Sequence, residues 1–348
     1  MTDKSRILAA DAAGIAAAAA LLNGGGIVAV PTETVYGLAA RAADGEAVAR
    51  IYAAKGRPSF NPLIVHVADA DAAARLAQVD ALAARLMAAF WPGPLTLVLP
   101  RQADAAVAAL VTAGLDTIAL RCPAHPVMQA LIAACGPLAA PSANASGRIS
   151  STSAAHVAGS LGDKVPLILD GGVSAAGVES TIVQVLDGGW RLLRPGAVAV
   201  EDIIKVANPP LPLRERSDSR SEPGEGLRAV PEEPLSRLGE GAESDLPPAG
   251  RGVVAPGMLA SHYAPRQPVR LNAVTAHASE FHIGFGAIAG DASLSATGDL
   301  IEAAARLFAL LHTAEASGRA VIAVAPVPAH GLGLAINDRL RRAAAPRD

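Results

Sequence analysis

The chain has 348 residues, of which 51% are hydrophobic and 18% charged, and its formal net charge is −3. This composition excludes a disordered chain, and the length exceeds that of a usual single domain, so one large and one smaller domain are expected. The two cysteines, Cys122 and Cys135, form no CxxC pair, which argues against a disulfide framework and against a cysteine-based zinc site.

The first predicted element is an alanine-rich helix over residues 11–22, ended by Asn23 and Gly24. Basic residues precede it, as in a signal peptide, but Asp11 interrupts the apolar run and glycines stand where a cleavage site would be needed. The run is also shorter than the roughly 20 residues that span a bilayer. We therefore expect a surface helix of a cytoplasmic protein without membrane contact.

Short apolar runs then alternate with helical patterns. The strand-like runs are residues 26–30, 63–67, 95–99, 117–120, 167–170 and 181–185, and the helical patterns are residues 45–54, 69–90 and 125–134. Such alternation is typical of an α/β fold. The sequence predicts an α/β domain over residues 1–206, packed mainly from aliphatic side chains because only 3% of the residues are aromatic.

The composition changes at residues 208–250, where proline, glycine, serine, glutamate and arginine dominate. Acidic residues outnumber basic ones by 11 to 6 in residues 201–250, and no run there could form a packed face. Strand-like runs follow at residues 269–271, 281–285 and 320–325, with a helical pattern at residues 299–315. We therefore predict a linker over residues 207–266 and a small α/β domain over residues 267–348.

The densest group of polar side chains is Pro-Thr-Glu-Thr-Val-Tyr-Gly-Leu at residues 31–38, directly after the strand predicted at residues 26–30. Open α/β sheets present their binding loops at strand ends, so these hydroxyls can bind a polar ligand. On this segment alone, a polar turn whose threonines cap a following helix is an equal alternative.

Two cations, Lys55 and Arg57, stand where the helix predicted at residues 45–54 breaks at Gly56. Arginine can grip phosphate oxygens bidentately and lysine adds a mobile charge, so the pair suits a polyphosphate. We expect both side chains to be exposed in a groove. The alternative is a solvated helix end whose cations favour the helix dipole.

Further polar residues end or follow the later strands. His66 and Arg121 close two of them, although His66 also fits a structural histidine and Arg121 a plain surface arginine. Residues 141–147, Pro-Ser-Ala-Asn-Ala-Ser-Gly, combine small side chains with hydroxyl and amide groups, which lets a backbone approach phosphate or adenine. The P-loop, Rossmann and His/Cys metal signatures are absent from the sequence, which disfavours the corresponding classes.

The chain resembles the YrdC-like family of threonylcarbamoyl-AMP synthases. The motifs that carry this resemblance are, in chain order, PTETVYGL, KGRP with NPLIVH, TIALR, PSANASG, GVESTIV and LRPG. SHYAP at residues 261–265 and GLGLAINDRLRRAA near the C-terminus resemble the longer, two-domain members. The likeness covers nearly the whole chain except residues 208–250. It implies a YrdC-like domain with a twisted sheet and a large concave groove, and a small C-terminal Rossmann-like α/β domain.

The resemblance implies an L-threonylcarbamoyladenylate synthase. This nucleotidyltransferase joins L-threonine, bicarbonate or carbon dioxide and ATP into threonylcarbamoyl-AMP, with release of diphosphate. Mg²⁺ is expected with ATP, and the motifs do not identify its ligands. The product is expected to pass to tRNA threonylcarbamoyl transferase proteins that modify adenosine 37, so contact with tRNA is only indirect.

The family's site residues are transferred motif by motif. The residues expected around threonine are Thr34, His66, Arg121, Ala140 and Ser180. The residues expected to contact ATP are Arg57, Asn61, Thr117, Ser142, Asn144, Ser150, Arg194 and Tyr263. Lys55 and Arg57 are expected to act in catalysis, and the segment 261–265 is expected to fold back over the first domain.

The implied reaction brings two anions together, so it requires several fixed cations, which Lys55, Arg57, Arg121 and Arg194 can supply. His66 is the one plausible general base, although positioning and charge neutralisation can suffice. Two other functions stay open. A double-stranded RNA or tRNA-binding module is disfavoured by the near-neutral charge, and carbamoyl transfer in hydrogenase maturation is disfavoured by the two unpaired cysteines.

Overall fold

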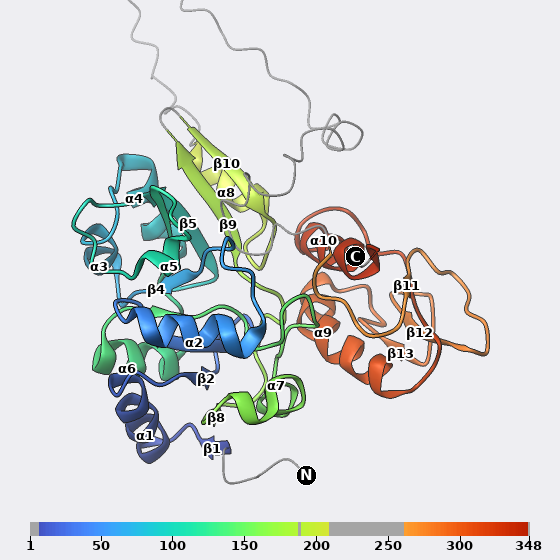
Figure 1. The fold of residues 1–348 in the computed structure, drawn as a ribbon. Helices are drawn as coiled ribbons and strands as arrows, with labels where there is room; N and C mark the ends of the chain where they lie inside the picture. Colours follow the sequence, from blue (N-terminus) through green and yellow to red (C-terminus); the bar gives the residue numbers. More distant parts are fainter. Residues whose placement is uncertain (1–6, 187–188, 209–260, 347–348) are drawn as a thin grey trace, which may run out of the picture.

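Two separate sheets organise the chain in the computed structural model, which describes residues 7–186, 189–208 and 261–346 (Figure 1). The first unit holds a ten-stranded mixed sheet with the order β1-β8-β2-β3-β7-β4-β6-β5-β9-β10. Its strands are β1 (Ile7–Ala9), β2 (Val28–Val30), β3 (Gly37–Arg41), β4 (Ile64–His66), β5 (Leu95–Pro100), β6 (Thr117–Arg121), β7 (Leu138–Ala139), β8 (Ile168–Asp170), β9 (Thr181–Leu186) and β10 (Gly189–Arg194). All six strands predicted in this unit are present, and the expected α/β class is confirmed.

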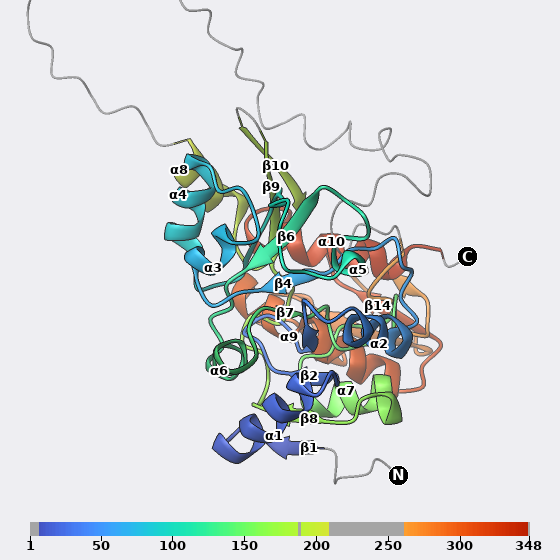
Figure 2. The same cartoon turned by 60° about the vertical axis from the view of Figure 1, so that its left-hand side comes forward.

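The described part of the first unit has eight α-helices, seven between its strands and one after β10. They are α1 (Ala12–Asn23), α2 (Gly45–Lys55), α3 (Ala70–Ala74), α4 (Ala81–Phe90), α5 (Ala109–Thr112), α6 (Pro126–Cys135), α7 (Ala154–Leu161) and α8 (Val200–Ala207). Aspartate caps begin several of them, since Asp11 accepts a hydrogen bond from the amide of Gly14 and Asp44 accepts one from the amide of Ala47. α1 packs against α6, and α4 against α8 (Figure 2).

The prediction of one helix over residues 69–90 was wrong, because two helices occupy this stretch. Between them the backbone bonds to another segment: the amide of Gln78 donates to the carbonyl of Pro100, and the amide of Gln102 donates to that of Leu76. Asp80 then caps the second helix by accepting from the amide of Ala83 at 2.7 Å. The apolar periodicity continues across the break, so the pattern alone did not reveal it.

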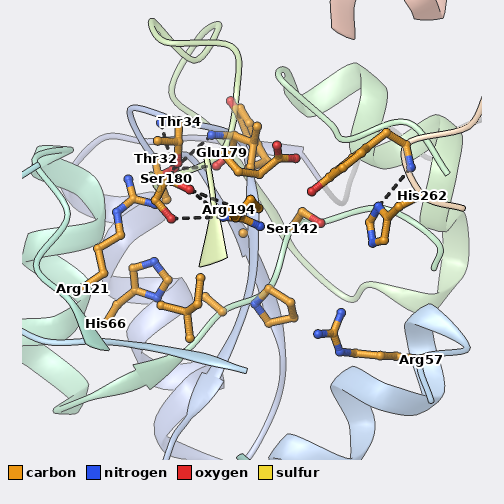
Figure 3. A pocket seen from close by; sticks show the side chains of 17 residues that line it. Thr32, Thr34, Arg57, His66, Arg121, Ser142, Glu179, Ser180, Arg194 and His262 are labelled. Carbon is orange, nitrogen blue, oxygen red and sulfur yellow. Dashed lines mark hydrogen bonds between the residues drawn. The ribbon is translucent and has the colours of Figure 1, made fainter. Parts of the chain in front are cut away.

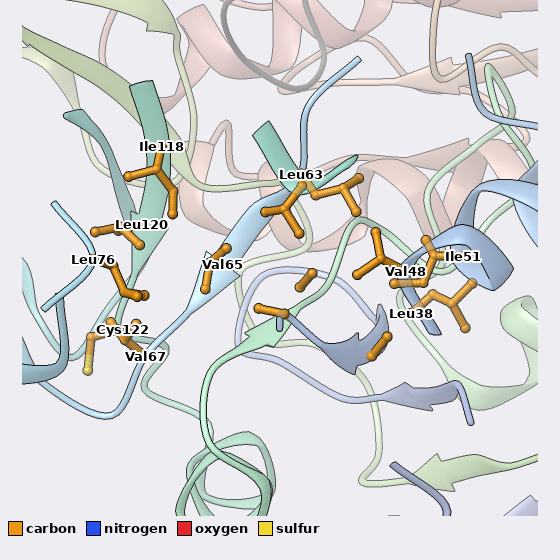
Figure 4. Packing of buried hydrophobic residues seen from close by; sticks show 14 of the residues in the cluster. Leu38, Val48, Ile51, Leu63, Val65, Val67, Leu76, Ile118, Leu120 and Cys122 are labelled. Atoms are coloured by element: carbon orange, nitrogen blue, oxygen red, sulfur yellow. The ribbon is translucent and has the colours of Figure 1, made fainter. Parts of the chain in front are cut away.

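The main core of the first unit is aliphatic, as the composition predicts. Leu38, Val48, Ile51, Val65 and Leu120 are all fully buried within it. Figure 4 shows side chains of the strands meeting those of α2 across this core. The packing fixes the strands whose ends carry the polar motifs.

The second unit holds a four-stranded sheet with the order β11-β14-β12-β13, in which each strand runs parallel to its neighbours. Its elements are β11 (Val269–Arg270), β12 (Glu280–Gly284), β13 (Ala292–Ser293), β14 (Val321–Val324), α9 (Leu300–Ala316) and α10 (Leu332–Ala344). The predicted strands and the helix at residues 299–315 are present. Residues 209–260 of the predicted linker lie outside the described residues.

The two units pack directly against each other through α9 (Figure 1). Val35, Ile149 and Val178 of the first unit share a hydrophobic cluster with Phe308 of α9. Gly177 is required at this contact, because a Cβ there would lie 2.4 Å from the carbonyl oxygen of Ala305. No helix in the described part of the chain has both the length and the apolar character of a membrane span.

Candidate active site

The polar motifs converge on one pocket of the first unit, at the side that faces the second unit. Its lining residues are Thr32, Thr34, Val35, Tyr36, Gly37, Arg57, Ile64, His66, Arg121, Ala140, Pro141, Ser142, Glu179, Ser180, Arg194, His262 and Tyr263. In Figure 3, His66 and Arg121 lie on one side of this pocket and Arg57 and His262 on the other, with Ser142 between them. The structure therefore brings most of the predicted site residues together.

The direction of two strands explains this division. β4 and β6 are parallel, so both end at the same side, at His66 and Arg121. Asn61 precedes β4, and Thr117 begins β6 at the opposite end, roughly 13 Å from Arg121 at the rise of an extended strand. His66 and Arg121, predicted for threonine, thus lie at the opposite end of this strand pair from Asn61 and Thr117, which are predicted for ATP. Thr117 does not line the pocket itself.

The loop at residues 31–36 connects β2 to the antiparallel strand β3, so the helix-capping alternative was wrong. Thr32 shapes the loop: its Oγ1 donates to the carbonyl of Val35 at 2.6 Å and lies 2.9 Å from Oγ1 of Thr34. This internal bonding holds the Thr34 hydroxyl at the pocket wall. Thr32 was missed as a contributor because its role is to support its neighbour.

Arg121 is buried at the end of β6, where several contacts hold its guanidinium in place. It donates to Thr34 Oγ1 at 2.9 Å and to the carbonyl of Gly93 at 3.2 Å, and it pairs with Glu33 at 2.7 Å. Burial alone would raise the pKa of Glu33, but Arg121 and the amide of Ala124 hold that pKa below its ordinary value. The arginine is therefore a preorganised cation and not the surface residue of the alternative prediction.

His66 is neutral in this environment. Burial, followed by the charge of Arg121, lowers its pKa to about 3. Its Nδ1 has no hydrogen-bond partner among the described residues, although it is buried. The imidazole can therefore form a hydrogen bond with a ligand, but it is a very weak base near neutral pH.

Arg57 is only 9% exposed, contrary to the predicted exposure. Its Nη2 donates to Asn61 Oδ1 at 2.6 Å and to the carbonyl of Pro62 at 2.8 Å, while Nε donates to the carbonyl of Asn61 at 3.1 Å. Burial lowers its pKa to about 10, which leaves the guanidinium charged at neutral pH. Asn61 itself does not line the pocket and instead orients Arg57 from behind.

The predicted exposure of Lys55 was also wrong, since its side chain is 4% exposed and does not line the pocket. Its Nζ donates to the carbonyls of Ser142 and Asn144, both at 2.5 Å. Burial and the nearby Arg57 hold the pKa of Lys55 well below its ordinary value. The amine donates both hydrogen bonds in either protonation state, so its visible role is to fix the loop at residues 141–147.

Two more predicted residues lie behind the pocket wall. Asn144 is fully buried, and its Nδ2 donates to the carbonyls of Ala145 and Arg148, both at 2.9 Å. Ser150 is also fully buried, and its hydroxyl donates to Glu179. Both residues stabilise the loops that carry lining side chains.

Ser180, just before β9, and Arg194, at the end of β10, are joined by hydrogen bonds. Arg194 Nη2 donates to the carbonyl of Ser180 at 2.9 Å and to its hydroxyl at 3.2 Å, and that hydroxyl lies 2.8 Å from Oγ1 of Thr96. Gly196 permits the close approach, because a Cβ there would lie 2.3 Å from the amide nitrogen of Thr181. Thr96 was missed because it lies within an ordinary apolar strand.

The segment 261–265 lies across the pocket, as expected. The amide of Ala264 donates to the carbonyl of Gly147 at 2.9 Å, and the side chains of His262 and Tyr263 line the cavity. Tyr263 is 1% exposed, with its ring 5.6 Å from that of Phe308. It is thus both packed at the contact between the units and part of the pocket.

Sequence reasoning missed two further charged residues at this contact. Glu179 lines the pocket, and its place in the GVESTIV motif was the available signal. Arg339 of α10 pairs with Glu179 at 2.9 Å and lies 5.3 Å from the centre of the Tyr263 ring. No local pattern distinguishes Arg339 from the other arginines of its helix.

The mixed sheet, the second α/β unit and the segment that covers the pocket define a two-domain α/β protein with buried cations at one cavity. Comparison with known proteins gives the family. Residues 20–196 match the Sua5/YciO/YrdC family model, described as telomere recombination, and residues 225–345 match that of the threonylcarbamoyl-AMP synthase C-terminal domain. The chain belongs to the threonylcarbamoyl-AMP synthase family, and the predicted class, a nucleotidyltransferase-type enzyme, is confirmed.

Relatives with this activity in their names cover most of the chain. The threonylcarbamoyl-AMP synthase of Pyrococcus abyssi is 39% identical over 346 residues, which are 94% of this chain and 92% of the relative. That of Bacillus subtilis is 43% identical over 265 residues, 74% of this chain and 66% of the relative. The crystal structure of P. abyssi Sua5 complexed with L-threonine is similar with a TM-score of 0.77 and 37% identity, covering 95% of this chain and 94% of that one.

Proposed function

We propose that this pocket makes threonylcarbamoyl-AMP and diphosphate from L-threonine, bicarbonate or carbon dioxide, and ATP. The observation that carries the proposal is the convergence of separate motifs on one cavity whose two sides differ in chemistry. The predicted residues that line it are Thr34, Arg57, His66, Arg121, Ala140, Ser142, Ser180, Arg194 and Tyr263. Family membership and the L-threonine complex of the P. abyssi protein support it.

The side with Arg121 is proposed to bind threonine. Its guanidinium would hold the carboxylate, because arginine matches a carboxylate in charge and geometry. The hydroxyls of Thr34 and Ser180 and the unpartnered Nδ1 of neutral His66 offer hydrogen bonds to the amine and hydroxyl groups. Ala140 leaves room for the methyl group beside them.

The other side is proposed to bind ATP. Arg57 and Arg194 would face the phosphates, with Ser142 at the pocket wall and Tyr263 against the nucleotide. The residues proposed to complete or support this region are Asn61, Thr117, Asn144, Ser150 and Lys55. Of these, Lys55 is now proposed to act by holding the carbonyls of the 141–147 loop and not by contacting phosphate directly.

The chemistry needs little acid or base from the protein. A neutral threonine amine takes up carbon dioxide and releases one proton to solvent, which gives a carbamate, and an oxygen of this carbamate attacks the α-phosphorus as diphosphate leaves. Fixed cations reduce the repulsion between the two anions and stabilise the charge that develops. With a pKa of about 3, His66 is not proposed as the general base, and close positioning of the reactants carries the remaining effect.

Mg²⁺ is proposed to arrive with ATP. Within residues 7–186, 189–208 and 261–346, no group of three or more His, Cys, Asp or Glu side chains could hold a metal ion. Glu179, which lines the pocket, already accepts from Ser150 and pairs with Arg339. The side chains in the described part of the chain therefore fit a Mg²⁺ ion that is held mainly by phosphate oxygens and water. Such an ion would neutralise part of the triphosphate charge.

Entry of ATP requires a movement at the pocket. With His262 and Tyr263 in place the cavity measures about 50 Å³, which is room for a few water molecules. We therefore propose that segment 261–265 opens to admit substrates and closes to shield the hydrolysable carbamate from water. The product would pass to tRNA threonylcarbamoyl transferase proteins in the cytoplasm.

The direct test is mass spectrometry of the protein incubated with ATP, Mg²⁺, L-threonine and bicarbonate. A product with the mass of threonylcarbamoyl-AMP, formed with one diphosphate per molecule and dependent on both threonine and bicarbonate, is the expected result. ATP turnover without that product would contradict the proposal. RNA binding with no adenylate formation would instead support the binding-module alternative.

A further inference from the structure

Arg339 is the one fully buried arginine in the described part of the chain, and it joins the two units. It lies on α10 of the second unit with 0% of its surface exposed. Its Nε donates to Glu179 Oε2 at 2.9 Å, and its Nη1 donates to the carbonyl of Pro195 at 2.5 Å and to Asp338 Oδ2 at 2.9 Å. Glu179 and Pro195 belong to the first unit, so one side chain bridges the interface.

Each group that Arg339 holds is connected to the pocket. Glu179 lines it and accepts a hydrogen bond from Ser150. Pro195 follows Arg194, which lines the pocket and holds Ser180. The guanidinium also lies 5.3 Å from the ring centre of Tyr263, close enough for a cation–π contact. Arg339 therefore contacts three segments that form or support the pocket wall.

Stability alone does not account for such an arrangement. A buried ion pair gains little over well-packed apolar residues of similar size, because both charges lose their hydration. The interface already has an apolar cluster in which Val35 and Val178 pack with Phe308 and Leu307. What the guanidinium adds is direction, since its planar donors fix the relative placement of several acceptors at once.

We propose that Arg339 is a positioning residue for adenylate formation, which makes the pocket competent only when the second unit is docked. It sets Glu179, the Arg194–Pro195 turn and the Tyr263 ring relative to one another, and so aligns the ATP side. This inference rests on the proposed function, in that the ligand it aligns is ATP.

The test compares three single variants and the Arg339→Met/Glu179→Gln double variant, all full-length. Arg339→Met keeps the apolar stem and removes the donors, whereas Glu179→Gln keeps the planar shape of the side-chain end and removes the charge. Arg341→Met is the matched control, because Arg341 is exposed on the same helix. Each is measured for ATP·Mg²⁺ binding by calorimetry, for kcat and KM with ATP and with threonine, and for thermal unfolding.

Arg339→Met is expected to weaken ATP binding and to raise the KM for ATP by about tenfold to a hundredfold, with a smaller change for threonine, because small misplacements in a site cost this much. Glu179→Gln should shift the same parameter, and the double variant should show less than the product of the two effects. Arg341→Met should match the wild type in every measurement.

Several results would overturn the inference. One is an Arg339→Met variant whose ATP affinity and KM for ATP equal those of the wild type. Another is a variant that loses activity only in proportion to the loss of folded protein, while its KM values for ATP and threonine are unchanged. If Arg339→Met does not fold, Glu179→Gln decides by the same criterion. If the wild type makes no threonylcarbamoyl-AMP, the proposed function fails, while the binding comparison still decides whether Arg339 positions a nucleotide site.

Discussion

Replacing Lys55 with methionine should destabilise the fold, although its place in the sequence suggests a free catalytic cation. The change removes the amine and keeps most of the apolar stem. It leaves the carbonyl of Asn144 without its donor, whereas the carbonyl of Ser142 keeps a hydrogen bond from the amide of Asn144 at 3.1 Å. An unsatisfied buried acceptor costs about 1–3 kcal/mol, so the free energy of unfolding should fall by about that amount. That is a large part of the roughly 5–15 kcal/mol of a typical domain.

Urea unfolding followed by circular dichroism measures this change, with Lys164→Met as a control because Lys164 is exposed. Activity per folded molecule should also fall by about a hundredfold, since the released loop carries Ser142 into the pocket wall. An unchanged unfolding midpoint in Lys55→Met would refute the structural reasoning. If activity were lost at the same time, Lys55 would be acting as a cation on the triphosphate.

Three further predictions concern the substrate, the pH and the covering segment. Valine should be a very poor substrate, since it lacks the hydroxyl that the threonine side can bond, and serine should lose only about 1 kcal/mol of methyl packing; equal rates for valine and threonine in a product assay would remove Thr34 and Ser180 from the proposed site. Burial lowers the pKa of His66 to about 3 and that of His156 to about 4, so the unfolded chain binds protons that the folded chain does not. Stability should therefore be full above pH 6.5 and decrease as the pH falls toward 4, and a urea midpoint independent of pH in this range would contradict it. Tyr263→Ala should raise the KM for ATP by about tenfold, whereas Tyr263→Phe should stay near the wild type; equal KM values in all three proteins would argue against closure over ATP.

The sequence predicted those parts of the structure that depend on local patterns. Apolar runs bounded by glycine, proline or aspartate marked six strands of the first sheet, and the helical patterns at residues 11–22, 45–54 and 125–134 begin within one residue of α1, α2 and α6. β3 and β10 were missed because short alanine-rich or mixed runs have no clear strand period. The break at residues 75–80 was missed because it depends on a hydrogen bond to Pro100 from a distant segment.

The candidate site shows the same division between local and distant information. Motifs that carry several polar residues in one loop, such as residues 31–38 and 141–147, were found because their composition is unusual. Arg339 was not found, since its partner Glu179 is 160 residues away in the chain. The burial of Arg57 could not be predicted either. The sequence shows that it is a cation near a helix end, but the acceptors around it are positioned by the folded loop.

The buried state of the three pocket arginines has a consequence for catalysis. Arg57, Arg121 and Arg194 are each at most 9% exposed, and each donates to a backbone carbonyl of the protein. Exposed side chains would have to be ordered when two anionic reactants meet, whereas these cations already have fixed directions in the fold. Folding therefore supplies the ordering before the substrates bind, which is the condition under which charges stabilise a transition state most strongly. It follows that stability and rate are coupled at these positions, so a substitution at any of the three must be judged by activity per folded molecule.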